Sequence, residues 1–174
     1  LPDSLSNIEV SLTSNETGKR VKRPLRDVLR ERYAEITAMD RSIGNLRSYL
    51  KENNLKENTL VFYCGDNGPP RSAGRTGVSL RSEKGRIYEG GIRVPGIVEW
   101  PARIKKPASS NMVAVTSDLY PTLAELTGQS LPERPIDGTS LVSVFDNQTS
   151  ERPEPLCFWQ FEIAKVFNKD AIPY

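Results

Sequence analysis

Apolar residues recur at steps of three and four between residues 24 and 50, and this period predicts a long amphipathic helix. Pro24 stands at its start, where the fixed φ of proline suits a first helical turn, and the polar residues 52–54 end it. Charged side chains occupy the opposite face, so we expect the helix to lie on a hydrophobic core. The apolar stripe consists of Leu25, Val28, Leu29, Ile36, Met39, Ile43, Leu46 and Leu50.

Short apolar runs after this helix predict strands. Residues 59–63, TLVFY, are apolar on both faces, as is typical of a strand buried inside a parallel sheet. A helix followed by a short loop and a buried strand is one unit of an α/β fold. Further strands are predicted at residues 97–100, 112–115 and 156–161.

A second helix is predicted after Asp118, a residue type that suits the N-cap position. Leu119, Leu123 and Leu126 would be its buried positions, and Gly128 would be its C-terminal stop. Residues 141–145 fit either a short helix or a strand.

Composition narrows the class of protein. The chain has 174 residues, 26% of them charged and 37% hydrophobic, which is ordinary for a soluble globular domain with one core. A net charge of +2 without a basic run gives no indication of nucleic acid binding, and no apolar stretch is long enough for a membrane span. The absence of histidine removes the usual general acid/base and the commonest zinc ligand. Cys64 and Cys157 do not make a disulfide scaffold, and we interpret them as free thiols, with a pairing left open.

Candidate chemistry lies in residues 65–91, a glycine-rich stretch without a hydrophobic period. Such long segments are usually either functional or disordered. We interpret this one as functional because it leaves the end of a predicted buried strand, where α/β sheets bind ligands. Asp66 and Asn67 follow that strand directly and offer two neighbouring oxygen donors of the kind that Ca²⁺ or Mg²⁺ prefers. The alternative is an ordinary turn, since Asp, Asn and Gly are common turn residues.

The same stretch carries basic residues interleaved with the glycines. Lys84 and the arginines are able to converge on an oxyanion such as sulfate or phosphate. For each arginine singly, a solvated surface position is the simpler interpretation, and no role is assigned to it. These arginines are Arg71, Arg75, Arg81 and Arg86 in the stretch and Arg93 just after it.

The order of these motifs resembles that of the sulfatase family, arylsulfatase type. Residues 59–69, TLVFYCGDNGP, resemble the family segment TLVIFTSDNGP, and residues 80–95, LRSEKGRIYEGGIRVP, resemble LRGGKGxxxEGGIRVP. Trp100-Pro101, the DLYPTL of residues 118–123 and the DGTSL of residues 137–141 follow in the family's order. The resemblance covers roughly residues 24–145.

The resemblance implies a sulfuric ester hydrolase with an alkaline-phosphatase-like α/β sandwich around a mixed sheet, of which this chain is the later part. It implies that Asp66 and Asn67 bind Ca²⁺ and that Lys84 is the catalytic lysine that contacts the sulfate group of the substrate. The implied substrate is a sulfated carbohydrate or an aryl sulfate, and the implied location is secreted, periplasmic or lysosomal. The implied domains are a connector over residues 1–23, the catalytic domain over 24–150 and the start of a small C-terminal subdomain over 151–174.

The resemblance also implies a nucleophile, a formylglycine made from the first residue of a Cys-x-Pro-x-Arg or Ser-x-Pro-x-Arg motif. Neither cysteine begins such a motif, because Cys64 is followed by Gly65-Asp66 and Cys157 by Phe158-Trp159. We therefore expect the nucleophile, the family's histidines and its first calcium aspartates in a missing N-terminal half. Two alternatives remain: a phosphate mono- or diester hydrolase of the same superfamily, and a non-catalytic module that binds sulfated glycans.

Residues 1–174 alone are expected to be marginally folded and inactive. A buried strand such as 59–63 needs neighbours on both edges and cover on both faces, and this segment supplies few strands. The purified chain should therefore not hydrolyse a nitrophenyl sulfate in the presence of Ca²⁺. Measurable turnover of that ester would contradict this expectation.

Overall fold

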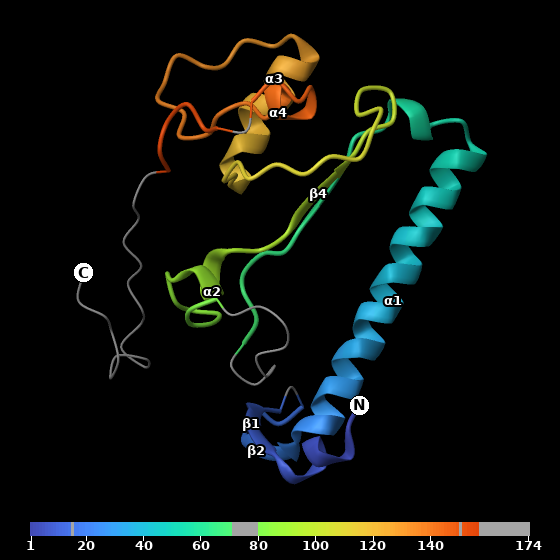
Figure 1. Cartoon of the computed structure of the whole chain (residues 1–174), viewed down its shortest axis with the longest axis vertical. Helices are drawn as coiled ribbons and strands as arrows, with labels where there is room; N and C mark the ends of the chain where they lie inside the picture. Colours follow the sequence, from blue (N-terminus) through green and yellow to red (C-terminus); the bar gives the residue numbers. More distant parts are fainter. Residues whose placement is uncertain (15, 71–79, 150, 157–174) are drawn as a thin grey trace. The chain divides into compact units, whose positions relative to one another are not determined.

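The computed structural model describes residues 1–14, 16–70, 80–149 and 151–156. The chain divides into two compact units, Leu1–Trp100 and Pro101–Tyr174 (Figure 1). This division falls inside the region 24–150 that was expected to form one domain. The other expected boundary lies between residues 150 and 151, and residue 150 is outside the described residues.

An antiparallel hairpin opens the first unit. Strand β1 (Glu9–Thr13) pairs with β2 (Arg20–Pro24), with Leu12 opposite Val21. The irregular connector expected over residues 1–23 is therefore wrong. Every second residue of β1 is half-buried, but the alternation is too short to stand out among the polar residues around it.

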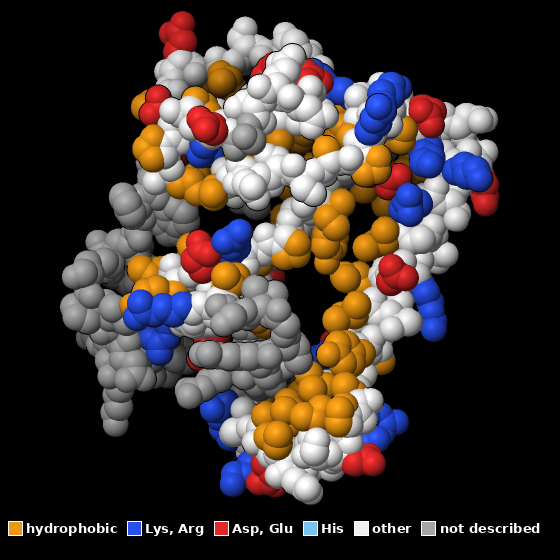
Figure 2. All heavy atoms as spheres, in the orientation of Figure 1, with side chains coloured by type: hydrophobic (Ala, Val, Ile, Leu, Met, Phe, Trp, Pro, Cys, Tyr) orange, Lys and Arg blue, Asp and Glu red, His pale blue; other side chains and the backbone are white. Residues whose placement is uncertain are grey.

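Helix α1 (Leu25–Glu52) follows β2 directly and confirms the long helix predicted from the apolar period. Its burial is uneven, because only Leu25, Val28 and Leu29 in the first turns are buried. Farther along, Ile36 is 53% exposed and Leu46 is 47% exposed. Figure 2 shows hydrophobic side chains uncovered along this helix. The expected packing on a core is thus present at the start of α1 and not along its length.

Strand β3 (Val61–Cys64) and strand β4 (Gly96–Glu99) form a second antiparallel pair, with Phe62 opposite Val98. Two of the predicted strands are confirmed with shifts of one or two residues. The parallel, fully buried setting predicted for β3 is not observed in the described residues, where the strand is half-buried. The chain returns alongside β3 after the glycine-rich stretch, and this return makes the pair antiparallel.

A bidentate ion pair links α1 to β4. Arg47 places Nε 2.8 Å and Nη2 3.1 Å from the two carboxylate oxygens of Glu99. The hydroxyl of Tyr63 on β3 also lies 3.7 Å from the sulfur of Met39 on α1. These contacts fix the strand pair, from which the candidate site emerges, against the helix.

The second unit contains helices α3 (Leu119–Thr127) and α4 (Val142–Phe145). Gly128 ends α3 with φ +67°, as predicted, and the helical interpretation of residues 141–145 is confirmed. The strand predicted at residues 112–115 does not form. The buried face of α3 was also predicted wrongly, since Leu123 is 48% exposed. Its buried residues are Pro121, Thr122 and Ala124.

Asp118 holds several segments of the second unit together through its carboxylate. Its side chain is fully buried, and its carboxylate accepts backbone N–H bonds from Val115 and Thr139, both at 2.8 Å. Arg152 donates to both carboxylate oxygens, from Nη1 at 2.7 Å and from Nη2 at 2.8 Å. The predicted N-cap residue thus directs its carboxylate to groups outside α3 and joins three segments of the chain.

The strand predicted nearest the C-terminus cannot be compared with the structure. The strand predicted at residues 156–161 lies almost wholly outside the described residues, as does Cys157. In the part of the chain that the structure describes, no helix is long and apolar enough to cross a membrane.

Candidate functional site

The predicted metal ligands lie directly after the end of β3. The Asp66 side chain is exposed and the Asn67 side chain is half-buried. Asp66 Oδ1 accepts the Asn67 N–H at 2.9 Å, and Asn67 Nδ2 donates to the Gly68 carbonyl at 2.9 Å. These two short bonds hold the side chains at the end of the strand and leave the Asp66 Oδ2 and Asn67 Oδ1 oxygens as further acceptors.

The segment that carries Lys84 is hydrogen-bonded to the segment that carries these ligands. The Lys84 N–H donates to the Pro69 carbonyl at 2.9 Å, and the Gly68 N–H donates to the Gly91 carbonyl at 2.8 Å. The Lys84 side chain is exposed. The structure therefore joins the segment that carries Asp66 and Asn67 to the segment that carries Lys84.

Glycines make this close approach possible. A Cβ on Gly68 would lie 1.9 Å from the Gly90 carbonyl oxygen, and a Cβ on Gly91 would lie 2.0 Å from the Arg86 oxygen. Both distances are far inside van der Waals contact with backbone atoms, which cannot move away as a side chain can. Gly68 is thus explained by sterics at the contact between the two segments, and Gly91 by the close approach of the Arg86 backbone within its own segment.

Two of the arginines of this stretch are engaged in local contacts. The Arg81 guanidinium lies 3.8 Å from the centre of the Tyr88 ring and donates to its hydroxyl at 3.0 Å. Arg93 pairs with Glu89 at 2.9 Å across the short helix α2 (Glu89–Ile92). Arg71 and Arg75 lie outside the described residues.

The donor set fits a hard cation in part. One charged carboxylate and one neutral amide oxygen are ligands that Ca²⁺ accepts, but its shell takes six to eight oxygens. Among residues 1–14, 16–70, 80–149 and 151–156, no group of three or more His, Cys, Asp or Glu lies together. Asp66 and Asn67 would therefore supply a share of a calcium shell rather than the whole of it. Cys64, at the end of β3, is a free thiol.

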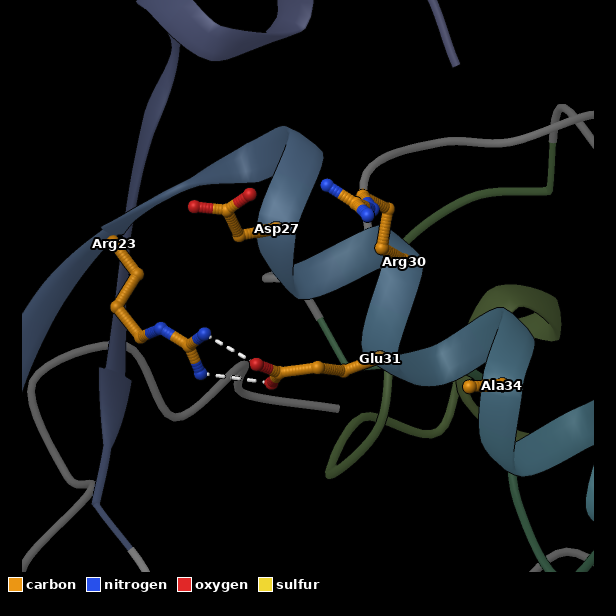
Figure 3. Close-up of a pocket in the computed structure, with 5 residues that line it drawn as sticks. All are labelled: Arg23, Asp27, Arg30, Glu31 and Ala34. Carbon is orange, nitrogen blue, oxygen red and sulfur yellow. Dashed lines mark hydrogen bonds and ion pairs between the residues drawn. The ribbon is translucent and has the colours of Figure 1, made fainter.

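An open cavity of about 480 Å³ lies elsewhere, between β2 and the start of α1 (Figure 3). Arg23 and Glu31 point toward one another there, and Arg23 Nη1 donates to Glu31 Oε2 at 2.8 Å. The bonds from Arg23 hold the pKa of the Glu31 carboxyl below its ordinary value. Because these two charges neutralise each other and no predicted site residue lines the cavity, we assign it no ligand.

One Ser-x-Pro-x-Arg stretch occurs at residues 130–134, SLPER, so the sequence does contain the serine form of the nucleophile motif. It follows the C-terminal stop of α3 and lies in the second unit. The sulfatase pattern places the nucleophile ahead of the Asp-Asn and lysine motifs, whereas this stretch comes after both. We therefore do not assign Ser130 as the nucleophile.

The family model described as Sulfatase matches residues 8–129. That match covers more than half of the chain, and the chain belongs to the sulfatase family. The match begins one residue before β1, earlier than the resemblance seen in the sequence, which starts near residue 24. The expected fold class, an alkaline-phosphatase-like α/β sandwich present in part, is confirmed by the solved structures described next.

Two relatives and two solved structures illustrate the similarity. Arylsulfatase A of Homo sapiens is 40% identical over 106 residues, which cover 59% of this chain and 21% of the relative. N-acetylgalactosamine-6-sulfatase of Canis lupus familiaris is 35% identical over 132 residues, which cover 71% of this chain and 25% of that relative. The structure of Ps i-CgsB with k-i-k-neocarrahexaose matches at a TM-score of 0.57 and 35% identity, covering 70% of this chain and 27% of that one. The structure of BT4656 with its substrate D-glucosamine-2-N,6-O-disulfate matches at a TM-score of 0.57 and 28% identity. The match covers 70% of this chain and 23% of that one.

This chain therefore spans about a fifth to a quarter of the length of the relatives it matches.

Proposed function

We propose that this chain is part of an enzyme that hydrolyses sulfate esters, in which Asp66 and Asn67 bind Ca²⁺ and Lys84 binds the sulfate group. The observation that carries the proposal is the pair of backbone hydrogen bonds between the two segments, Lys84 N–H to Pro69 and Gly68 N–H to Gly91. Membership of the sulfatase family supports the reaction class.

Asp66 would provide the charged ligand oxygen, and Asn67 would provide a neutral one. The Asn67 amide nitrogen is engaged with the Gly68 carbonyl, which orients the side chain so that its oxygen is the group available to a cation. A bound Ca²⁺ would neutralise sulfate oxygens and polarise the sulfur for attack. Both side chains stand at the end of β3, so the ordered strand fixes their position.

Lys84 would place its ammonium group on the sulfate from the adjoining segment. The ammonium is a compact charge on a flexible stem, which suits a group whose oxygens gain charge as the ester bond breaks. In this proposal the nucleophile is a formylglycine from a part of the protein outside residues 1–174. The substrate is a sulfated carbohydrate or an aryl sulfate; the structure of BT4656 was obtained with a sulfated glucosamine as its substrate.

Replacing Lys84 with alanine in the full-length protein should lower kcat/KM for a nitrophenyl sulfate by about 10²–10³-fold, the usual cost of losing one preorganised charge-stabilising group. The loss should fall mainly on kcat, because the charge of the sulfate group, on which the ammonium is placed, is redistributed in the transition state. Lys51→Ala is the matched control, since Lys51 is an exposed lysine in the last turn of α1.

The same assay separates the competing functions. A sulfatase should turn over the nitrophenyl sulfate faster than the matched nitrophenyl phosphate, and the loss in Lys84→Ala should be seen with the sulfate. Faster turnover of the phosphate would identify a phosphate ester hydrolase instead. Binding of sulfated glycan without turnover of either ester would identify a non-catalytic module.

A further inference from the structure

We infer that Arg81 and Tyr88 form a clamp that positions Lys84, an inference that rests on the proposed function. Lys84 lies between these two residues in the sequence, in a turn over residues 81–88. The Arg81 guanidinium stacks 3.8 Å from the centre of the Tyr88 ring and donates to its hydroxyl at 3.0 Å. A cation over an aromatic face with an added hydrogen bond is a specific contact that joins the two ends of the turn.

The backbone at both ends of the turn is anchored to α2. The Gly90 N–H donates to the Arg81 carbonyl at 2.7 Å, and the Gly91 N–H donates to the Tyr88 carbonyl at 2.7 Å. The middle of the turn is held on another side, where the Lys84 N–H reaches Pro69. The side-chain clamp thus closes a turn whose centre contacts the segment with the proposed metal ligands.

The turn needs such support because its conformation is unfavourable for part of its sequence. Ser82 has φ +72°, in the left-handed region that costs energy for a residue with a Cβ. Gly85 has φ +83°, which glycine adopts freely. Ser82 lies next to Arg81, so the clamp acts where the backbone would otherwise relax. The ammonium of Lys84 stands on a flexible stem that is anchored only at the backbone. The region that the ammonium reaches therefore depends on the backbone that the clamp holds.

In this scheme Arg81 is a positioning residue that acts through Lys84. The rival interpretation is that Arg81 binds the sulfated substrate directly. Arg81 is exposed, so its side chain is accessible to a substrate. The two differ in how the effects of Arg81 and Lys84 combine. A residue that acts through Lys84 loses its effect once Lys84 is removed, whereas an independent contact does not.

The test is a double-mutant cycle in the full-length protein, with a nitrophenyl sulfate as substrate. Arg81→Met should lower kcat/KM about tenfold by displacing the lysine, and Arg81→Lys should not restore the planar stack. In the Lys84→Ala background, Arg81→Met should change kcat/KM by less than about twofold. An equal loss in both backgrounds would overturn the clamp. Arg41→Met controls for removal of an exposed arginine from α1.

Variants of the partner separate the two parts of the contact. Tyr88→Phe keeps the ring face and loses the hydroxyl, so its effect should be smaller than that of Tyr88→Leu, which loses both. Equal effects of the two variants would show that the stack contributes nothing. The phenylalanine variant also keeps the shape of the half-buried ring, which protects the test from a failure to fold.

A second readout does not depend on activity. In hydrogen–deuterium exchange by mass spectrometry, peptides that cover residues 81–92 should exchange several times faster in Arg81→Met than in the wild type. Unchanged exchange would overturn the clamp even if the rate falls. If Lys84→Ala proves fully active, the proposed role of Lys84 fails, while faster exchange would still support the clamp as a support of this turn.

Discussion

Replacing Asp66 with alanine in the full-length protein should weaken Ca²⁺ binding by at least about a hundredfold and remove most of the sulfatase activity. Asp66 is the charged member of the proposed ligand pair, and a cation loses most when a charged ligand is lost. The measurement is calcium-dependent thermal stability alongside turnover of a nitrophenyl sulfate. At a Ca²⁺ concentration of about 100 times Kd, the ion should stabilise the wild type by about 2.7 kcal/mol, and this gain should be nearly absent in the variant.

Other variants show whether the loss is specific to the ligand position. Asp40→Ala removes an exposed carboxylate from α1 and should leave calcium-dependent stability unchanged. Asn67→Ala should weaken binding less than Asp66→Ala, because a neutral oxygen contributes less to a hard cation than a carboxylate does. If Asp66→Ala kept its full calcium-dependent stabilisation, the ligand assignment would be wrong, whatever happened to the activity.

Replacing Arg152 with methionine should destabilise the protein by about 3–5 kcal/mol, because it leaves the fully buried Asp118 without its cation. The measurement is the urea midpoint of the full-length protein. Arg103→Met is the matched control: Arg103 also forms a two-bond pair with an aspartate, Asp146, but the two side chains are 30% and 27% exposed. Water can solvate Asp146 when Arg103 is removed, so the control variant should lose about 1 kcal/mol of stability or less. Equal costs for the two variants would contradict a buried role for Asp118.

The effect of pH follows from the pKa of Asp118. Burial opposes ionisation and acts to raise this pKa, but the hydrogen bonds from Arg152, Val115 and Thr139 outweigh it, and the net pKa lies below the ordinary value. A carboxyl with a lowered folded-state pKa stabilises the fold above its unfolded pKa of about 4 and loses that effect as the pH falls further. The free-energy difference between the wild type and Arg152→Met should therefore narrow at acidic pH. A difference that widens on acidification would contradict this account.

The elements with long or well-marked patterns could be predicted from the sequence. The apolar period of α1 extends over seven turns, and the Gly128 stop of α3 reflects a backbone conformation that glycine adopts most easily. Burial could not be predicted as well, because a period shows which face is apolar and not what covers it. Leu46 on α1 and Leu123 on α3 are apolar residues that remain exposed.

Motifs in the sequence suggest the candidate site but do not predict its contacts. Residue types and order single out Asp66, Asn67 and Lys84, whereas the hydrogen bonds that join their segments are seen only in the structure. Nothing in the sequence singles out Arg81 or Arg152, since each is one of many arginines. The partner of Arg81 is Tyr88, which is not acidic, and the partner of Arg152 is Asp118, which is distant in the sequence. An aromatic residue seven positions after an arginine, as with Tyr88, would be a usable signal only in a segment already known to turn back on itself.

The contact between Gly68 and Gly90 bears on how sequence variants of this protein should be interpreted. An added methyl group at either glycine would meet backbone oxygen within 2.3 Å, although neither residue is proposed to touch the substrate or the ion. Missense changes at Gly68 should therefore push the two hydrogen-bonded segments apart, and those at Gly90 should displace the backbone of residues 81 and 82, so both should disrupt the candidate site. They would be mistaken for harmless changes by any scheme that weighs only the chemistry of the replaced side chain.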